Sequence, residues 1–192
     1  VNFAYITKDY TTAILQAQNM MQAHGNNTPA AVYRLAAYAA YAQKNYAGTI
    51  EWIEQYFHRE QNPDRIVTDN YRLLADAYDK SAQLTRAKEN WLKAAEFETV
   101  ENKKGFYYDQ AAAIAVKMND KSGAADIQKK AYERKANPAK ADIIKYGNAL
   151  YDAAQYNACI TLYKTYLTRF PDDWRAPLWI ARSLALLDPE LK

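Results

Sequence analysis

The sequence is poor in residues that make tight turns, cross-link a fold or fill a membrane. Among 192 residues there are five Gly, six Pro and one Cys. An all-β fold needs many tight turns, so this composition argues against one. The single thiol, Cys159, cannot form an intrachain disulfide and does not indicate a redox compartment. No apolar run approaches the roughly 20 residues that span a bilayer.

A large excess of charge of one sign is also lacking. The 25 Lys and Arg residues are balanced by 22 Asp and Glu residues, for a formal charge of +3, and the signs are interspersed. A nucleic-acid surface would need a clustered basic stripe. We therefore expect a soluble chain with a solvated surface, no nucleic-acid partner and no membrane insertion. With no targeting signal in the sequence, the compartment, cytoplasmic or periplasmic, is left open.

What the chain does have is a short phrase that returns five times. It consists of two mostly polar residues and a large residue, followed three positions later by a small one. The copies are Lys8-Asp9-Tyr10, Lys44-Asn45-Tyr46, Ala82-Gln83-Leu84, Asn119-Asp120-Lys121 and Ala154-Gln155-Tyr156. The intervals between them are 36, 38, 37 and 35 residues. A period in this range indicates a solenoid, whose units bury their apolar faces by stacking on neighbours.

Two helical stretches lie between successive copies of the phrase. Thr28-Pro29 predicts a helix start with Thr28 as the N-cap, and Asn62-Pro63 predicts the end of the following helix. The spacing of apolar residues predicts about eleven helices and no strand. We expect one all-α repeat domain over 1–192, part of a longer chain because its terminal units are incomplete. The units are 1–25 (partial), 28–62, 67–100, 104–137, 139–171 and 173–192 (partial).

Small residues recur at equivalent places on these helices. On the leading helix of each pair they are Ala37, Ala75, Ala112, Gly147 and Ala181. On the trailing helix they are Ala13, Thr49, Ala87, Ala124 and Cys159. Small side chains let helix axes approach closely, so these positions are predicted to be the helix crossings.

The pattern resembles the tetratricopeptide repeat (TPR), whose loose signature is W-x₂-L-G-x₂-Y followed by A-x₃-F, A and P. The third unit carries it as Tyr71-x₂-Leu74-Ala75-x₂-Tyr78 and then Ala87-x₃-Trp91-x₂-Ala94. The fifth carries it as Ile143-x₂-Tyr146-Gly147-x₂-Leu150, then Cys159-x₃-Tyr163 and Pro171. The resemblance covers nearly the whole chain, with the fourth unit the poorest match.

The resemblance implies a right-handed superhelical solenoid of antiparallel helix pairs whose leading helices line a concave groove. It further implies a scaffold or adaptor that binds a peptide or protein in that groove. By analogy the groove residues are Arg34, Tyr38, Tyr41, Arg72, Asp76, Asp79, Phe106, Asp109, Asn148, Tyr151 and Arg182. One TPR subclass clamps a partner's C-terminal carboxylates with Lys and Asn; Arg34 and Tyr38 stand at those places, so that mode is not favoured.

No catalytic, cofactor or metal constellation is found in the sequence. His24 and His58 have no second His or Cys at ligand spacing, and Cys159 fills a packing place. The scattered Gly residues form no phosphate-binding loop. Asp172-Asp173 precede a helix, where capping explains them. We expect no enzyme activity, no cofactor and no metal.

Three functions remain open after this reading. The first is a binding module for a peptide or protein, with an aromatic and charged groove; the groove tyrosines could equally pack against the neighbouring leading helix. The second is a structural spacer in a larger protein, with self-association through exposed terminal repeats. The third, a single-stranded RNA-binding helical repeat, is disfavoured by the near-neutral charge.

Overall fold

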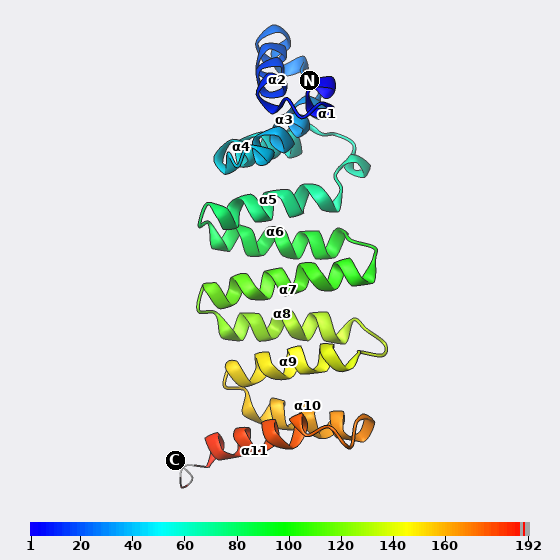
Figure 1. Ribbon diagram of the computed structural model, residues 1–192, viewed down its shortest axis with the longest axis vertical. Helices are drawn as coiled ribbons and strands as arrows, with labels where there is room; N and C mark the ends of the chain where they lie inside the picture. The colour runs from blue at the N-terminus through cyan, green and yellow to red at the C-terminus, as the bar shows by residue number, and fades with distance from the viewer. Residues whose placement is uncertain (189, 191–192) are drawn as a thin grey trace. The chain divides into compact units, whose positions relative to one another are not determined.

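The computed structural model describes residues 1–188 and 190. Within them the regular elements are eleven α-helices and two short 3₁₀ helices, with no strand (Figure 1), which confirms the all-α prediction. Residues 189, 191 and 192 of the expected last unit lie outside the described residues. The α-helices are α1 (Asn2–Ile6), α2 (Tyr10–His24), α3 (Ala30–Ala42), α4 (Tyr46–Arg59), α5 (Thr68–Lys80), α6 (Leu84–Phe97), α7 (Glu101–Lys117), α8 (Lys121–Glu133), α9 (Lys140–Asp152), α10 (Tyr156–Arg169) and α11 (Arg175–Leu187). The 3₁₀ helices are η1 (Gly25–Asn27) and η2 (Pro63–Arg65).

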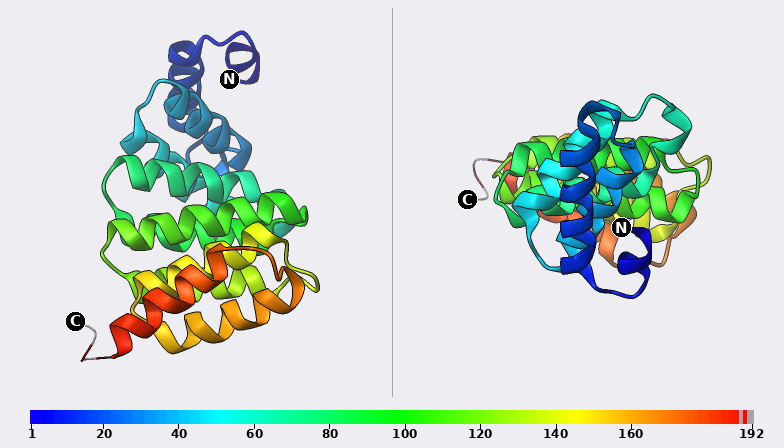
Figure 2. Two further views of the ribbon diagram at one scale, coloured as in Figure 1. Left: turned by 60° about the horizontal axis from the view of Figure 1, so that its bottom comes forward. Right: turned by 90° about the horizontal axis from the view of Figure 1, so that it is seen from above.

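The chain divides into two compact units, Val1–Tyr107 and Tyr108–Lys192, called unit 1 and unit 2 below. In unit 1, α3 packs against α4 and α5 against α6, and the leading helices α1, α3 and α5 also contact one another in series (Figure 2). In unit 2, α8 packs against α9, α9 against α10 and α10 against α11. None of the described helices combines the length and apolarity needed to cross a membrane.

The recurrent phrase builds the tight turn inside each helix pair. Its first residue adopts a left-handed conformation in all five copies, with φ between 57° and 61°. In the second copy the Lys44 amide donates to the Tyr41 carbonyl and the Asn45 amide donates to the Ala40 carbonyl, both over 2.9 Å. The other four turns repeat these two bonds. This Schellman arrangement satisfies the last carbonyls of each leading helix.

In three of its five copies the second residue of the phrase caps the trailing helix with its side chain, whereas Gln83 and Gln155 make no such bond. The side chains of Asp9, Asn45 and Asp120 accept hydrogen bonds from the amides of Thr12, Gly48 and Gly123. Side-chain oxygens placed this way satisfy one of the free amides at a helix start. In these three copies the phrase therefore ends one helix and begins the next within three residues.

Two of the expected helix ends are wrong. Pro29, rather than Thr28, is the N-cap of α3, and the Thr28 hydroxyl donates to the Gly25 carbonyl over 2.8 Å. Helix α4 ends at Arg59, and Asn62 instead caps η2 by accepting from the Asp64 amide over 3.0 Å. In both cases the side chain bonds to the backbone of an adjacent 3₁₀ turn. The sequence pattern alone does not distinguish such a turn from a helix end.

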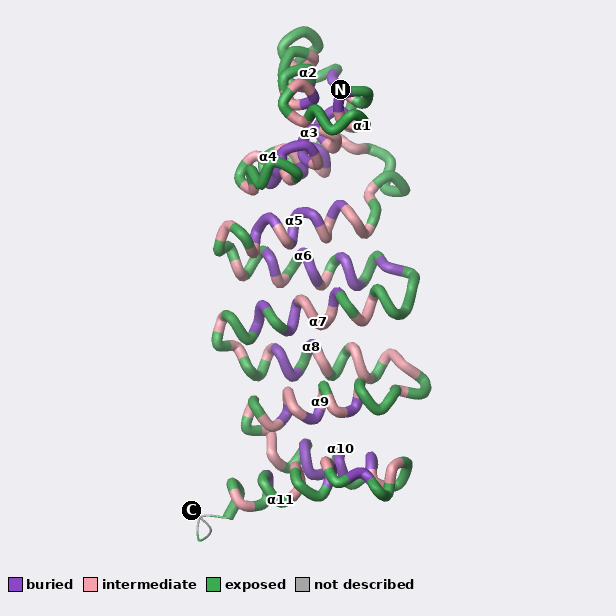
Figure 3. The backbone as a smooth tube through the Cα atoms, viewed as in Figure 1, coloured by how far each residue is buried: buried purple, intermediate pink, exposed green. Residues whose placement is uncertain are grey.

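The small residues lie at the packed crossings, as predicted, with one exception. Residues 13, 49, 87, 124 and 159 on the trailing helices are buried, and so are 37, 75, 112 and 147 on the leading ones (Figure 3). Ala181 is exposed because no described helix follows α11 to cover it; the buried residues of α11 are Ala176 and Ser183.

Candidate binding surface on the leading helices

In unit 1 the predicted groove residues of α3 and α5 bind one another. The Tyr38 hydroxyl donates to Asp69 Oδ2 over 2.6 Å, and Arg72 Nε lies 2.5 Å from Asp69 Oδ1. Burial and the bond to Asp69 raise the pKa of Tyr38 well above its usual value. Although burial alone would raise it, the bonds from Arg72 and Tyr38 hold the pKa of Asp69 below its ordinary value. This contact joins two successive leading helices.

A second contact of the same kind lies one turn further along. The Tyr41 hydroxyl donates to Asp76 Oδ2 over 2.5 Å. Burial, followed by this bond, raises the pKa of Tyr41 to about 12. Together the two tyrosines close the surface between α3 and α5 with the chain's own side chains.

Tyr41 also belongs to a ring pair that spans the turn of its helix pair. Its ring centre is 6.0 Å from that of Tyr46, the first residue of α4. The matching positions hold Tyr5 and Tyr10, 5.9 Å apart, and Tyr151 and Tyr156, 5.6 Å apart. Edge-on and tilted aromatic pairs at such distances are favourable. Three of the five turns therefore carry the same ring pair.

The α7–α8 turn lacks the ring pair. Val116 and Lys121 stand where three other turns carry tyrosines, and Ala113 occupies the place of Tyr38. The α5–α6 turn also lacks the ring pair, since Asp79 and Leu84 hold its two places. Val116 is 57% exposed. The side chains that close the surface in unit 1 are thus missing from this part of unit 2.

A pocket of about 450 Å³ opens at this place in unit 2. It is lined by Asp109, Ala112, Ala113, Val116, Lys121, Ala124, Gln128, Lys145, Asn148, Ala149 and Asp152. These residues come from α7, α8 and α9. The volume falls within the roughly 300–1,000 Å³ typical of ligand sites.

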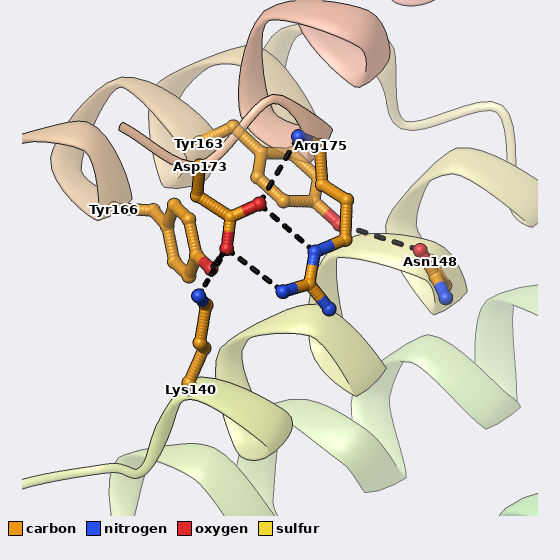
Figure 4. Close-up of polar contacts among 6 residues, drawn as sticks. All are labelled: Lys140, Asn148, Tyr163, Tyr166, Asp173 and Arg175. Atoms are coloured by element: carbon orange, nitrogen blue, oxygen red, sulfur yellow. Dashed lines mark hydrogen bonds and ion pairs between the residues drawn. The ribbon is translucent and has the colours of Figure 1, made fainter. Parts of the chain in front are cut away.

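The pocket has a small-residue floor and a polar rim. Ala112 and Ala124 are buried beneath it. On the rim, Asp109 accepts from Lys145 Nζ over 2.5 Å and from Gln128 Nε2 over 3.1 Å. Asn148 Oδ1 accepts from the Tyr163 hydroxyl over 3.3 Å (Figure 4). The site can therefore receive an apolar group below and offer hydrogen bonds at its edge.

The remaining predicted groove residues lie apart from this pocket. The Arg34 guanidinium is 5.5 Å from the Tyr56 ring centre, and that of Arg182 is 5.1 Å from the Trp179 ring centre. Phe106 packs edge-on against Trp91 of α6 at 6.2 Å. Tyr151 packs against Trp179 at 4.8 Å. Asp79 lies near the C-terminal end of α5.

Of the eleven predicted groove residues, the pocket brings together only Asp109 and Asn148. Sequence reasoning missed Val116, Lys121 and Lys145. A signal for two of them was present. Lys121 stands in the phrase where three copies have tyrosine, and Val116 stands three residues before the phrase where the same three repeats have tyrosine. Nothing in the pattern pointed to Lys145.

A separate polar cluster in unit 2 is structural. Asp173, only 8% exposed, accepts two bonds of 2.9 Å from the Arg175 guanidinium and one of 2.5 Å from Lys140 Nζ. The Tyr166 hydroxyl donates to the same carboxylate (Figure 4). The bonds from Arg175, Lys140 and Tyr166 hold the pKa of Asp173 well below its usual range. This cluster ties the start of α9 and the end of α10 to the start of α11.

The residues considered for catalysis or metal binding have structural surroundings. Cys159 is buried, and burial raises the pKa of its thiol. His24 and His58 are exposed in the last turns of α2 and α4. Within the described part of the chain, no three His, Cys, Asp or Glu side chains gather as metal ligands would.

Comparison with known proteins supports the fold. No protein-family model matches the chain, and neither does any curated protein. The C-terminal part of a TPR repeat-containing protein from Cytophaga hutchinsonii is similar over 98% of this chain and 70% of that chain, with a TM-score of 0.59 and 19% identity. A chain of the Naa15/Naa10 structure bound to HypK-THB is similar over 94% of this chain and 27% of that chain, with a TM-score of 0.60 and 15% identity. The chain has a TPR-like all-α repeat fold, as the sequence resemblance implied.

Proposed function

We propose that this protein is a protein-interaction module that binds a peptide segment of its partner over the α7–α9 pocket of unit 2. The observation that carries this proposal is the pocket itself. It lies between the leading helices α7 and α9, with α8 contributing to its lining, and a TPR-like fold would present its groove on leading helices. The equivalent place of α3 and α4 holds the paired rings of Tyr41 and Tyr46.

The chemistry of the pocket favours a peptide over a reacting substrate. Its small-residue floor can bury one large side chain, and burial of such an anchor supplies much of the energy of an interface. Asn148 and Gln128 can bond to a peptide backbone. Asp109 and Lys145 neutralise each other, so neither is poised as a general acid or base. We therefore expect binding without catalysis.

The similar chain from the Naa15/Naa10 structure supports the proposal indirectly. In that structure Naa15/Naa10 is bound to HypK-THB. A fold of this kind therefore occurs in an assembly of several proteins. The partner of the present chain has to be found by experiment.

Selection of peptides tests the function. A displayed library of random 12-residue peptides is panned against the chain, and the selected peptides are titrated calorimetrically. We expect binders that lose at least tenfold in affinity when Ala113 is replaced by Arg, because the long side chain fills the pocket mouth. Because Ala113 is exposed, Ala113→Arg should change the free energy of unfolding by no more than about 0.5 kcal/mol.

A matched control places the same side chain elsewhere in unit 2. Ala158 is an exposed alanine of α10 outside the pocket, and Ala158→Arg should keep full affinity. Equal binding by Ala113→Arg and wild type, or failure to select any peptide, would contradict the proposed function.

A further inference from the structure

We infer that the α7–α9 pocket receives a tyrosine side chain of the partner, with the ring over Ala113 and Val116 and the hydroxyl at Asn148. This inference rests on the proposed function and adds the chemistry of the anchoring residue. It is drawn from the tyrosine that three other turns carry at the same place and from the hydrogen bond that Tyr41 makes there.

The equivalent places can be aligned by the left-handed residue that ends each leading helix. Tyr41 lies three residues before Lys44, and Val116 lies three residues before Asn119. Tyr5 and Tyr151 hold the same place before Lys8 and Ala154. A tyrosine therefore occupies this position in three of the five turns.

The hydrogen-bond partner of the tyrosine can be aligned as well. Asp76, which accepts from the Tyr41 hydroxyl over 2.5 Å, is the fifth residue from the C-terminal end of α5. The fifth residue from the end of α9 is Asn148. Asn148 accepts from Tyr163 through Oδ1, and among the described residues its Nδ2 donates to none. In unit 2 the polar partner is present, while Val116 stands where α3 supplies the phenol of Tyr41.

The cations beside the pocket fit an aromatic guest. Lys121 replaces the ring of Tyr46, and Lys145 stands in α9 where α5 carries Leu73. Lysine ammonium groups are attracted to the faces of aromatic rings. Val116 adds apolar surface for the ring edge. An aliphatic guest would leave Lys121 and the Asn148 amide without this match.

Three small probes separate the ring from its hydroxyl. N-acetyl-L-tyrosinamide, N-acetyl-L-phenylalaninamide and N-acetyl-L-alaninamide are titrated into the ¹⁵N-labelled chain and followed by NMR. We expect shifts centred on Ala113, Val116, Asn148 and Ala149. The tyrosine probe should bind about fivefold more tightly than the phenylalanine probe, since one hydrogen bond separates them. The alanine probe should not saturate the site.

Three variants make the test specific. Val116→Tyr, which introduces the residue found at this place in three other turns, should abolish the response to the tyrosine probe while the chain stays folded. Lys164→Tyr, at an exposed place on α10, should leave the response unchanged. Asn148→Ala should bring the two aromatic probes to equal affinity without weakening the phenylalanine probe.

Equal or tighter binding of the phenylalanine probe to the wild-type chain would overturn the inference. So would an unchanged response in Val116→Tyr. Either result leaves the proposed function intact if the selected 12-residue peptides still depend on Ala113. Loss of that dependence would instead remove the proposed function.

Discussion

The leading helices of unit 1 and unit 2 share one backbone plan but present different surfaces. Between α3 and α5, Tyr38 and Tyr41 reach the carboxylates of Asp69 and Asp76 and close the surface. Between α7 and α9, an alanine and a valine stand in their places, and a pocket of about 450 Å³ is left. The two surfaces thus differ at equivalent positions: one is bridged by the chain's own tyrosines, and the other holds a pocket.

The largest expected effect comes from the helix crossing that holds α9 against α10. A Cβ atom at Gly147 would lie 2.6 Å from ring atoms of Tyr163, which is fully buried. Gly147→Leu should therefore destabilise unit 2 by about 3 kcal/mol, measured by urea denaturation. Ala158→Leu, at an exposed site of the same hairpin, should change stability by less than about 0.5 kcal/mol. Equal midpoints for the two variants would argue against this crossing.

Opening the surface of unit 1 should cost less and create a second site. Tyr41→Ala removes a half-buried ring and its contact with Tyr46, so we expect a loss of about 2 kcal/mol. Tyr41→Phe keeps the ring and should lose about 1 kcal/mol. Only Tyr41→Ala should gain a second binding event for N-acetyl-L-tyrosinamide, seen as new shifts in α3 and α5. Identical shifts in both variants would contradict the claim that the ring of Tyr41 occupies the place of a second binding site.

Alkaline pH should loosen the tyrosine-closed surface. Because the folded pKa of Tyr41 is raised to about 12 and that of Tyr38 higher still, these groups bind protons more tightly in the folded chain. Their contribution to stability is complete below the unfolded pKa of about 10 and is lost as pH rises through 12. Unfolding at pH 8, 10 and 12 should show this fall, and the Tyr38→Phe, Tyr41→Phe double variant should show a smaller one. A larger loss of stability in the double variant would contradict the prediction that Tyr38 and Tyr41 stabilise the chain less as the pH rises.

The smallest change in stability should come from replacing a left-handed alanine in a turn, and each unit offers one such position. Ala82 and Ala154 hold φ values of 58° and 57°, which an alanine adopts at a cost. Ala82→Gly and Ala154→Gly should each stabilise the chain by about 0.5 kcal/mol, the relief of strain offset by the larger unfolded-state entropy of Gly. Ala153→Gly, at a φ of −82°, should be destabilising. Its melting midpoint gives the reference for the other two.

The sequence predicted the repeat because the phrase encodes a local event. A left-handed residue, an N-cap and a buried small residue each act within one turn, so their spacing is visible without the fold. The five identical turns and the buried crossings followed from that spacing. Ala181 was misplaced because a leading helix buries this position only when another helix follows it.

The candidate site was harder to predict because it depends on contacts between repeats. The sequence left open whether Tyr38 and Tyr41 face a partner or pack against the neighbouring leading helix, and their hydroxyls reach Asp69 and Asp76 on that helix. Asp109 and Asn148 were predicted and do line the pocket. Lys145 was missed because its position is defined only when α9 packs beside α7.

The most direct test of the account exchanges the surfaces of the two units. A peptide selected on the wild-type chain is titrated against a Val116→Tyr, Lys121→Tyr double variant, which installs in the α7–α8 turn the ring pair that three other turns carry. We predict at least a tenfold loss of affinity, with a melting temperature equal to or above that of the wild type. Unchanged affinity in this folded variant would contradict the claim that the missing ring pair opens the binding site.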